Sequence, residues 1–430
     1  MDTPFLRLRG RIDELGKHHR RFLVFIARHM RNLVDRLEVQ GTLDRVKLWS
    51  LSTSIEEELR IVAAAGREER ESLDFMACYY AMQFLQSNVI ALDKLALDLA
   101  DPEHLDVACR GFIQFQDRAA HRLHGGYMAA LMERFLGDAP HPEYAVCVVG
   151  TRFDQDDLDL GVIHEGEEGL AAFKKALTRT VNEMFRHAIQ PHLYISEHLS
   201  LSGYSATLDE YRSGLSKGTQ DFVMTSELLS AQLLTGSEEV FAGFQEKIVG
   251  RYYQRSGLGL RFHEGYLRGL LGDMQALLVR DVHRDRLNFK QDGLRLAKGL
   301  LHAGKVIHGI RMADPFAVCE ALREKVPRRA EDFNLLESAM VMIEVFRHLY
   351  QLFSVQEEVV EVAAGAEGAV LDQVAMAMGY STRGGVRPRD QILVHYYAWV
   401  HDIRTVANRM FDDLTRYLRG TSLFTSSFVD

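Results

Sequence analysis

Most of the chain carries apolar side chains at the spacing of amphipathic helices. Between about residues 12 and 39 they recur every three or four positions, on one face of the expected helix: Leu23, Ile26, Met30, Leu33 and Leu37. Residues 73–99 are apolar on more than one face, which is typical of a helix at the centre of a bundle. A further helix is expected over residues 105–136, with a break at Gly125 and Gly126. The pattern therefore predicts a helical N-terminal domain over residues 1–125.

The pattern changes to short apolar runs after the proline-containing segment at residues 137–142. Two strands, a helix and a third strand are expected, over about residues 144–149, 158–163, 168–189 and 192–196. This order is typical of a small mixed sheet that is flanked by helices. We therefore expect a small α/β domain over residues 126–236.

The spacing becomes helical again from about residue 226, and the expected helices include residues 227–234 and 389–418. A helical C-terminal domain is therefore expected over residues 237–430. The fold class that follows is α+β, predominantly α. It consists of a helical N-terminal domain, a small mixed-sheet domain and a helical C-terminal domain.

The composition excludes several classes of function. The net charge of −9 offers no basic surplus for a nucleic-acid-binding surface. No apolar run approaches the ~20 residues that cross a bilayer, and the N-terminus lacks the apolar core of a signal peptide. The four cysteines lie far apart, without the spacing of a zinc site. We therefore expect a cytoplasmic protein whose partners are neither nucleic acid nor a membrane.

The segment between the first two expected strands carries the candidate chemistry. It begins with Gly150 and Thr151 and ends with Asp157 and Asp159, which are two positions apart. Since alternate residues of a strand face the same side, the two carboxylates are expected side by side. Paired carboxylates can hold two magnesium (or manganese) ions that clamp the reacting oxygens of nucleotidyl transfer. Gly150 and Thr151 would seat the phosphates of a nucleoside triphosphate (NTP), and Arg152 would add a cationic contact.

Several segments after this hairpin resemble, in order and spacing, the PII-protein uridylyltransferases and the related nucleotidyltransferases found with CBS domains. The resemblance extends over about residues 140–415. The segments that carry it are residues 203–210 (GYSATLDE), 221–236 (DFVMTSELLSAQLLTG), 288–295 (NFKQDGLR), 371–380 and 395–397. The resemblance implies that the α/β domain has a fold of the DNA polymerase β-like nucleotidyltransferase superfamily, with a helical substrate-binding region behind it.

The resemblance also implies roles for particular residues. It matches the two aspartates of the hairpin to the family's metal-binding pair, and it makes Asp221 the candidate for a third catalytic carboxylate, with Glu197 as its rival. Lys290 and Arg295 match basic residues of a Lys…Gly-Leu-Arg element and would face phosphate or a partner. The implied reaction moves a nucleoside monophosphate from an NTP to a PII-like protein or to a small molecule, with magnesium or manganese.

The chain also departs from the family's pattern. Its hairpin turn is shorter and lacks Gly-Arg-Gly-Glu, and Ser230 and Gln232 stand where the family tends to have Glu and Arg. His401 and Asp402 resemble the dipeptide of metal-dependent phosphohydrolases, but they are expected on a helix surface. The chain is thus expected to lack both that hydrolase and the ACT domains.

Two alternatives stay open from the residues alone. The first is an acidic hairpin whose aspartates simply face solvent. The second is a catalytically impaired nucleotidyltransferase fold that acts as a nucleotide sensor or signalling scaffold and uses its helical regions to bind a partner or to form a homodimer.

Overall fold

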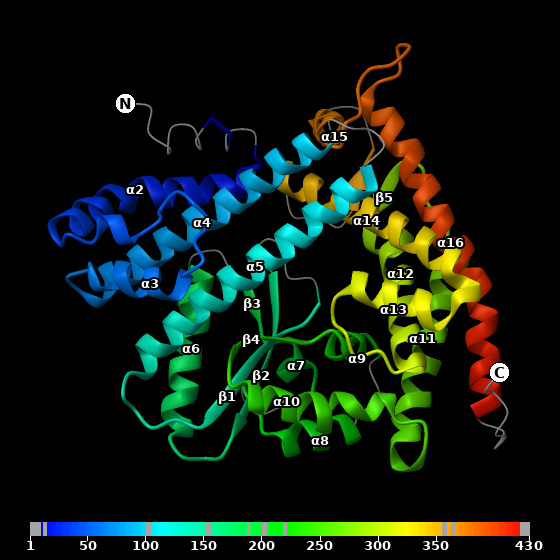
Figure 1. The fold of residues 1–430 in the computed structure, drawn as a ribbon, viewed down its shortest axis with the longest axis horizontal. Coiled ribbons are helices and arrows are strands. Elements are labelled where there is room, and N and C mark those ends of the chain that lie inside the picture. The colour runs from blue at the N-terminus through cyan, green and yellow to red at the C-terminus, as the bar shows by residue number, and fades with distance from the viewer. Residues whose placement is uncertain are drawn as a thin grey trace.

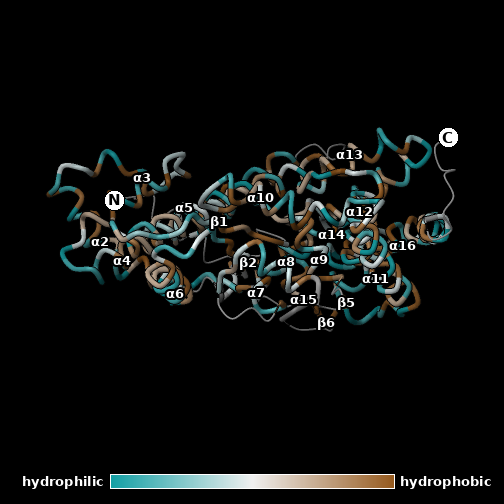
Figure 2. Tube along the Cα trace, turned by 90° about the horizontal axis from the view of Figure 1, so that it is seen from below, coloured by the Kyte–Doolittle hydropathy of each residue, from teal (hydrophilic) through white to brown (hydrophobic). Residues whose placement is uncertain are grey.

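The computed structural model describes residues 10–11, 15–99, 105–150, 157–186, 190–199, 204–217, 222–354, 359–362 and 366–421. Most of these residues are helical, and the described strands form one four-stranded mixed sheet and one two-stranded sheet. The predicted class, α+β and predominantly α, is therefore confirmed. Seen from below, the molecule is a long, flat body with the N-terminal helices at one end and the last helix at the other (Figure 2).

The N-terminal part is a bundle of long helices around one apolar helix. Its members are α2 (Lys17–Val39), α3 (Ile55–Ala64), α4 (Glu69–Asp98) and α5 (Leu105–Leu136). Helix α4 is buried on nearly all sides through its middle and packs against the other three. This position is the one that its all-round apolar pattern predicted.

The mixed sheet lies against α5 near the middle of the molecule (Figure 1). Its strands are β1 (Glu143–Val148), β2 (Asp157–Glu165), β3 (Gln190–His192) and β4 (Gln232–Gly236). They lie in the order β3-β2-β1-β4; β1 pairs antiparallel with β2 and β4, and β2 pairs parallel with β3. The first two strands were therefore predicted correctly from their apolar runs.

Two parts of the sheet differ from the prediction. The third strand ends at His192, and helix α7 (Tyr194–His198) replaces the rest of the expected strand. Residues 232–234, expected at the end of a helix over residues 227–234, belong instead to the edge strand β4. A short apolar run suits a helix or a strand equally well, and here pairing with the open edge of β1 decides for the strand.

Helix α5 is continuous, so the predicted break at its glycine pair is wrong. Glycine within a helix costs only about 1 kcal/mol relative to alanine, which packing can offset. The two glycines instead permit close packing. A Cβ on Gly125 would lie 2.7 Å from the carbonyl oxygen of Leu234 in β4, and one on Gly126 would lie 2.8 Å from Cγ2 of Ile55.

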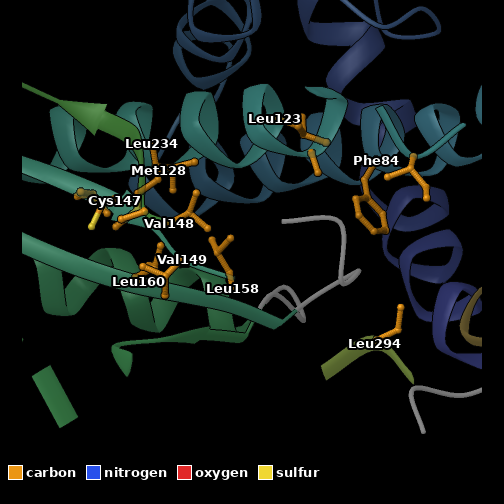
Figure 3. Packing of buried hydrophobic residues seen from close by; sticks show 14 of the residues in the cluster. Phe84, Leu123, Met128, Cys147, Val148, Val149, Leu158, Leu160, Leu234 and Leu294 are labelled. Carbon is orange, nitrogen blue, oxygen red and sulfur yellow. The ribbon is translucent and has the colours of Figure 1, made fainter. Parts of the chain in front are cut away.

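The face of the sheet towards α5 is apolar. Val148, Leu158, Leu160 and Leu234 pack there beside Met128 of α5, and all five are buried (Figure 3). Because side chains alternate along a strand, Asp159 lies on the opposite side of β2 from Leu158 and Leu160. Other helices of this region pack on the sheet and around it: α6 (Leu170–Arg186), α8 (Leu208–Lys217), α9 (Phe222–Leu229) and α10 (Glu238–Lys247).

The C-terminal part is helical, as predicted, but also contains a small sheet. Its helices are α11 (Leu260–Val279), α12 (Arg295–His308), α13 (Pro315–Lys325), α14 (Ala330–Phe353), α15 (Ala366–Ala377) and α16 (Pro388–Thr421). The unexpected strands β5 (Arg286–Asn288) and β6 (Val359–Glu361) pair antiparallel. Helix α14 packs against α5, so the apolar core runs through all three parts of the chain. Helix α16 forms one edge of the molecule (Figure 1).

Among the described residues, no helix is both long and apolar enough to cross a membrane. The four cysteines are free and buried. His401 is exposed on α16 and lies 3.4 Å from the hydroxyl of Thr405, as expected for a surface residue of a helix.

Candidate functional site

The hairpin between β1 and β2 is held at its base by regular strand pairing. Val148 pairs with Leu160, and the backbone N–H of Val149 donates to the carbonyl oxygen of Asp159 at 3.0 Å. Gly150 then leaves the strand at a φ of +70°, in the left-handed region that favours glycine. Thr151 and Arg152 lie outside the described residues. Their predicted contacts to phosphate therefore stay predictions.

Two carboxylates approach this glycine from different elements. A Cβ on Gly150 would lie 2.9 Å from Oε2 of Glu227, on α9, and 3.8 Å from Oδ2 of Asp159, on β2. Asp157 opens β2 two positions before Asp159, and its backbone is paired with Gln190 of β3. The side chain of Asp157 lies outside the described part of the structure. The two carboxylates therefore lie close to Gly150, where no side chain fills the space between them.

His192 holds the other oxygen of Asp159. Because β2 and β3 run parallel, His192 lies directly opposite Asp159 in the sheet. The distance from His192 Nδ1 to Asp159 Oδ1 is 3.0 Å, and that from His192 Nε2 to Glu197 Oε2 is 2.7 Å. Burial lowers the pKa of His192, but its hydrogen bonds to the two carboxylates and their charges outweigh burial and raise the pKa overall. A protonated imidazole with both N–H groups donating fits this geometry.

The His192 ion pairs predict a pH-dependent stability. A raised pKa in the folded state means that the pairs stabilise fully below the ordinary value of 6.5 and lose their effect as the pH rises through the raised value. We expect His192→Gln to lower the free energy of unfolding by about 0.5 kcal/mol near pH 6, because the imidazole is partly exposed, and by less at higher pH. Denaturant unfolding of both proteins at several pH values measures the difference. His283→Gln, at an exposed histidine, is the control, and an equal loss at every pH would contradict the expectation.

The other predicted site residues have different surroundings. Asp221 lies outside the described residues. Glu197 is on α7 and reaches Asp159 only through His192. Arg295 makes a two-pronged ion pair with Asp273, at 2.6 and 2.8 Å, and Lys290 is exposed. Neither basic residue makes a hydrogen bond or ion pair with a described residue of the hairpin.

Ser230, at the position where the uridylyltransferases tend to have Glu, makes a contact between two helices. The hydroxyl of Ser230, just after α9, lies 3.0 Å from Nε2 of His302 on α12. From the same helix, Lys305 donates to the carbonyl oxygen of Leu229 at 2.7 Å, and burial lowers the pKa of this lysine to about 8. These contacts attach α12 to the end of α9, the helix that carries Glu227.

Sequence reasoning missed two members of the site, His192 and Glu227. A signal for His192 was available: a third strand parallel to β2 places a residue beside Asp159. No local signal points to Glu227, because α9 meets the hairpin only through the tertiary fold.

The donor set partly fits a divalent ion. Within the described parts of the chain, no three histidine, cysteine, aspartate or glutamate side chains are placed to hold a metal. Asp159 and Glu227 are hard oxygen donors of the kind that magnesium and manganese prefer. Asp157 stands two positions before Asp159 on β2.

Comparisons with known proteins add no relative. The sequence matches no protein-family model, and no curated protein matches it at a significant level.

Proposed function

We propose that this protein is a metal-dependent nucleotidyltransferase that moves a nucleoside monophosphate from an NTP to a PII-like protein or a small molecule. The observation that carries the proposal is the approach of Asp159 and Glu227 to Gly150, at a turn where the backbone is left-handed. A glycine turn of this kind allows phosphate to approach the backbone closely, and paired carboxylates hold magnesium or manganese. The motif order that resembles the uridylyltransferases supports the same reaction.

In this proposal, each residue of the site has its own role. Asp159, with Asp157 beside it on β2, would hold the metal, which when bound neutralises the charge of the phosphates. Gly150 and Thr151 would seat the phosphates. His192 orients Asp159 by binding Oδ1, which leaves Oδ2 towards Gly150. When His192 is protonated, its charge offsets those of Asp159 and Glu197, and this lowers the repulsion that a triphosphate would meet.

The test is transfer of label from each of the four ribonucleoside triphosphates, with magnesium or manganese, to an acceptor in a cell extract. We expect one nucleotide to label an acceptor. The double substitution Asp157→Asn and Asp159→Asn is expected to abolish the labelling, because it removes both charges that hold the metal. Asp281→Asn changes an exposed aspartate outside the site and serves as the control. An absence of transfer, together with unchanged metal-dependent NTP affinity in the double variant, would refute the proposal.

The second candidate is a nucleotide sensor or scaffold without turnover. The contact between His192 and Asp159 favours it, because Oδ1 of Asp159 is already bound to the imidazole. The same assay separates the candidates: a sensor binds NTP through the hairpin but labels no acceptor.

A further inference from the structure

A group of arginines that form no ion pair with a described residue lies around the short helix η3 (Val249–Tyr253), which leads from α10 towards α11. We call the four residues Arg251, Arg255, Arg261 and Arg311 the arginine cluster. Arg251 is half-buried, and the other three are exposed. The cluster contrasts with the chain as a whole, whose net charge is −9.

Contacts to two aromatic rings place three of these arginines around the same turn, and Arg255 follows η3 by two residues in the chain. The Cζ atoms of Arg251 and Arg261 lie 5.0 and 4.8 Å from the centre of the Phe262 ring, so both guanidinium groups flank one side chain. Arg311 follows α12, and its Cζ lies 5.4 Å from the centre of the Tyr253 ring. The guanidinium of Arg311 also comes within 3.8 Å of the position that a Cβ on Gly250 would take.

The cluster has no negative charge to balance it within the described structure. None of its four arginines makes an ion pair or a side-chain hydrogen bond with a described residue, and Nη1 of Arg251 is buried without a partner. Several other half-buried arginines of the described structure have polar partners: Arg295, for example, pairs with Asp273, and Arg404 donates to backbone carbonyl oxygens. Glu264, which follows Arg261 by three positions, pairs with Arg268 instead of with the cluster.

The pKa values of groups in and beside the cluster are lowered, as expected where groups are buried and positive charges gather. Burial lowers the pKa of Arg251, and the positive charges of Arg212 and Arg261 lower it further. Burial also lowers the pKa of His263 and His308, and Arg255 adds to both shifts. Charges of one sign that are gathered without a counterion destabilise the fold, so their presence is evidence for an anion that offsets them.

The start of α11 adds to the positive potential. This helix begins at Leu260, its N-cap is Gly259, and no side chain caps its first backbone N–H groups. The N–H of Leu260 donates to the carbonyl oxygen of Gly257 in the preceding turn, so only the N–H groups that follow it remain to attract an anion. Arg261 and Phe262 belong to this first turn, so the helix start and the arginine cluster share one location.

We propose that the arginine cluster and the start of α11 bind a compact oligophosphate anion. Guanidinium groups match phosphate oxygens in paired hydrogen bonds, and several of them can share the charges of one oligophosphate. Phe262 is only 5% exposed and packs beneath two of the arginines, so it presents no open ring on which a nucleobase could stack. The site therefore recognises the phosphate chain rather than a base, and it is made of residues other than those of the β1–β2 hairpin.

The test is a calorimetric titration of the full chain with inorganic tripolyphosphate, at low salt and in the presence of EDTA. EDTA removes divalent ions, and Asp159→Asn is expected to bind equally well, which separates this site from the proposed transferase site. We expect the double substitution Arg251→Gln and Arg261→Gln to weaken binding by about 100-fold, roughly tenfold for each guanidinium that is removed. Arg383→Gln, at an exposed arginine on the loop before α16, is expected to bind as the wild type does.

A second variant separates binding from folding. Arg251→Met keeps an apolar stem on Phe262 but removes the unpartnered Nη1, so it is expected to weaken binding without lowering the unfolding temperature in the absence of anion. Three results would overturn the proposal: no binding of tripolyphosphate, equal binding by the double variant, or tighter binding of a single-stranded oligonucleotide than of tripolyphosphate.

Discussion

Replacing Gly150 with valine is expected to weaken metal-dependent NTP binding, and any nucleotidyl transfer, by about 100-fold. The residue has a φ of +70°, which a β-branched side chain tolerates poorly. Its Cβ would also lie 2.9 Å from Oε2 of Glu227, in the space where we place the phosphates. The measurements are NTP affinity with magnesium and the rate of label transfer.

A matched glycine provides the control for this experiment. Gly166 follows β2, has a φ of +83° and has open space where a Cβ would be placed. Gly166→Val therefore carries the backbone strain without filling the site, and it is expected to lower stability while NTP affinity is kept. Equal losses of affinity in the two variants would show that Gly150 acts only through the fold.

Replacing Tyr396 with alanine is expected to lower the free energy of unfolding by about 3–5 kcal/mol, the largest stability effect that we predict. Tyr396 of α16 is fully buried, and its ring lies edge-on to those of Phe289 and Phe346, with centres 5.6 and 5.8 Å away. Its hydroxyl donates to Oδ2 of Asp292 at 2.9 Å, and Asp292 is itself only 4% exposed. Truncation leaves both a cavity and a buried carboxylate with one donor fewer.

The conservative variant separates these two effects. Tyr396→Phe keeps the ring and removes only the donor, so a loss of about 1–3 kcal/mol is expected. Tyr204→Ala, at a tyrosine that is 46% exposed, is the control and is expected to change stability by less than about 1 kcal/mol. Denaturant unfolding measures all three variants. A loss in Tyr396→Ala no larger than in Tyr204→Ala would contradict the packing of α16 on this cluster.

Hydrophobic periodicity predicted the elements well where the apolar pattern was long or lay between clear turn signals. The all-round apolar character of α4 marked it as the central helix, and the runs around residues 144–149 and 158–163 became β1 and β2. It failed where local signals are ambiguous. Part of the edge strand β4 was taken for a helix, and the glycine pair in α5 was taken for a break. In both cases a contact between β4 and its neighbours, distant in sequence, decides the conformation.

Some features of the candidate site could likewise be predicted from the sequence, and others could not. A glycine turn followed by two aspartates at alternate positions of a strand can be recognised from the residues alone, because strand alternation acts over two residues. The packing of distant segments is what brings Glu227 to Gly150 and His192 to Asp159, and what gathers Arg251, Arg261 and Arg311 around one turn. The two kinds of contact differ in how far apart along the chain their residues lie. Backbone hydrogen bonding and side-chain alternation are local, whereas contacts between distant segments depend on how strands pair and helices pack.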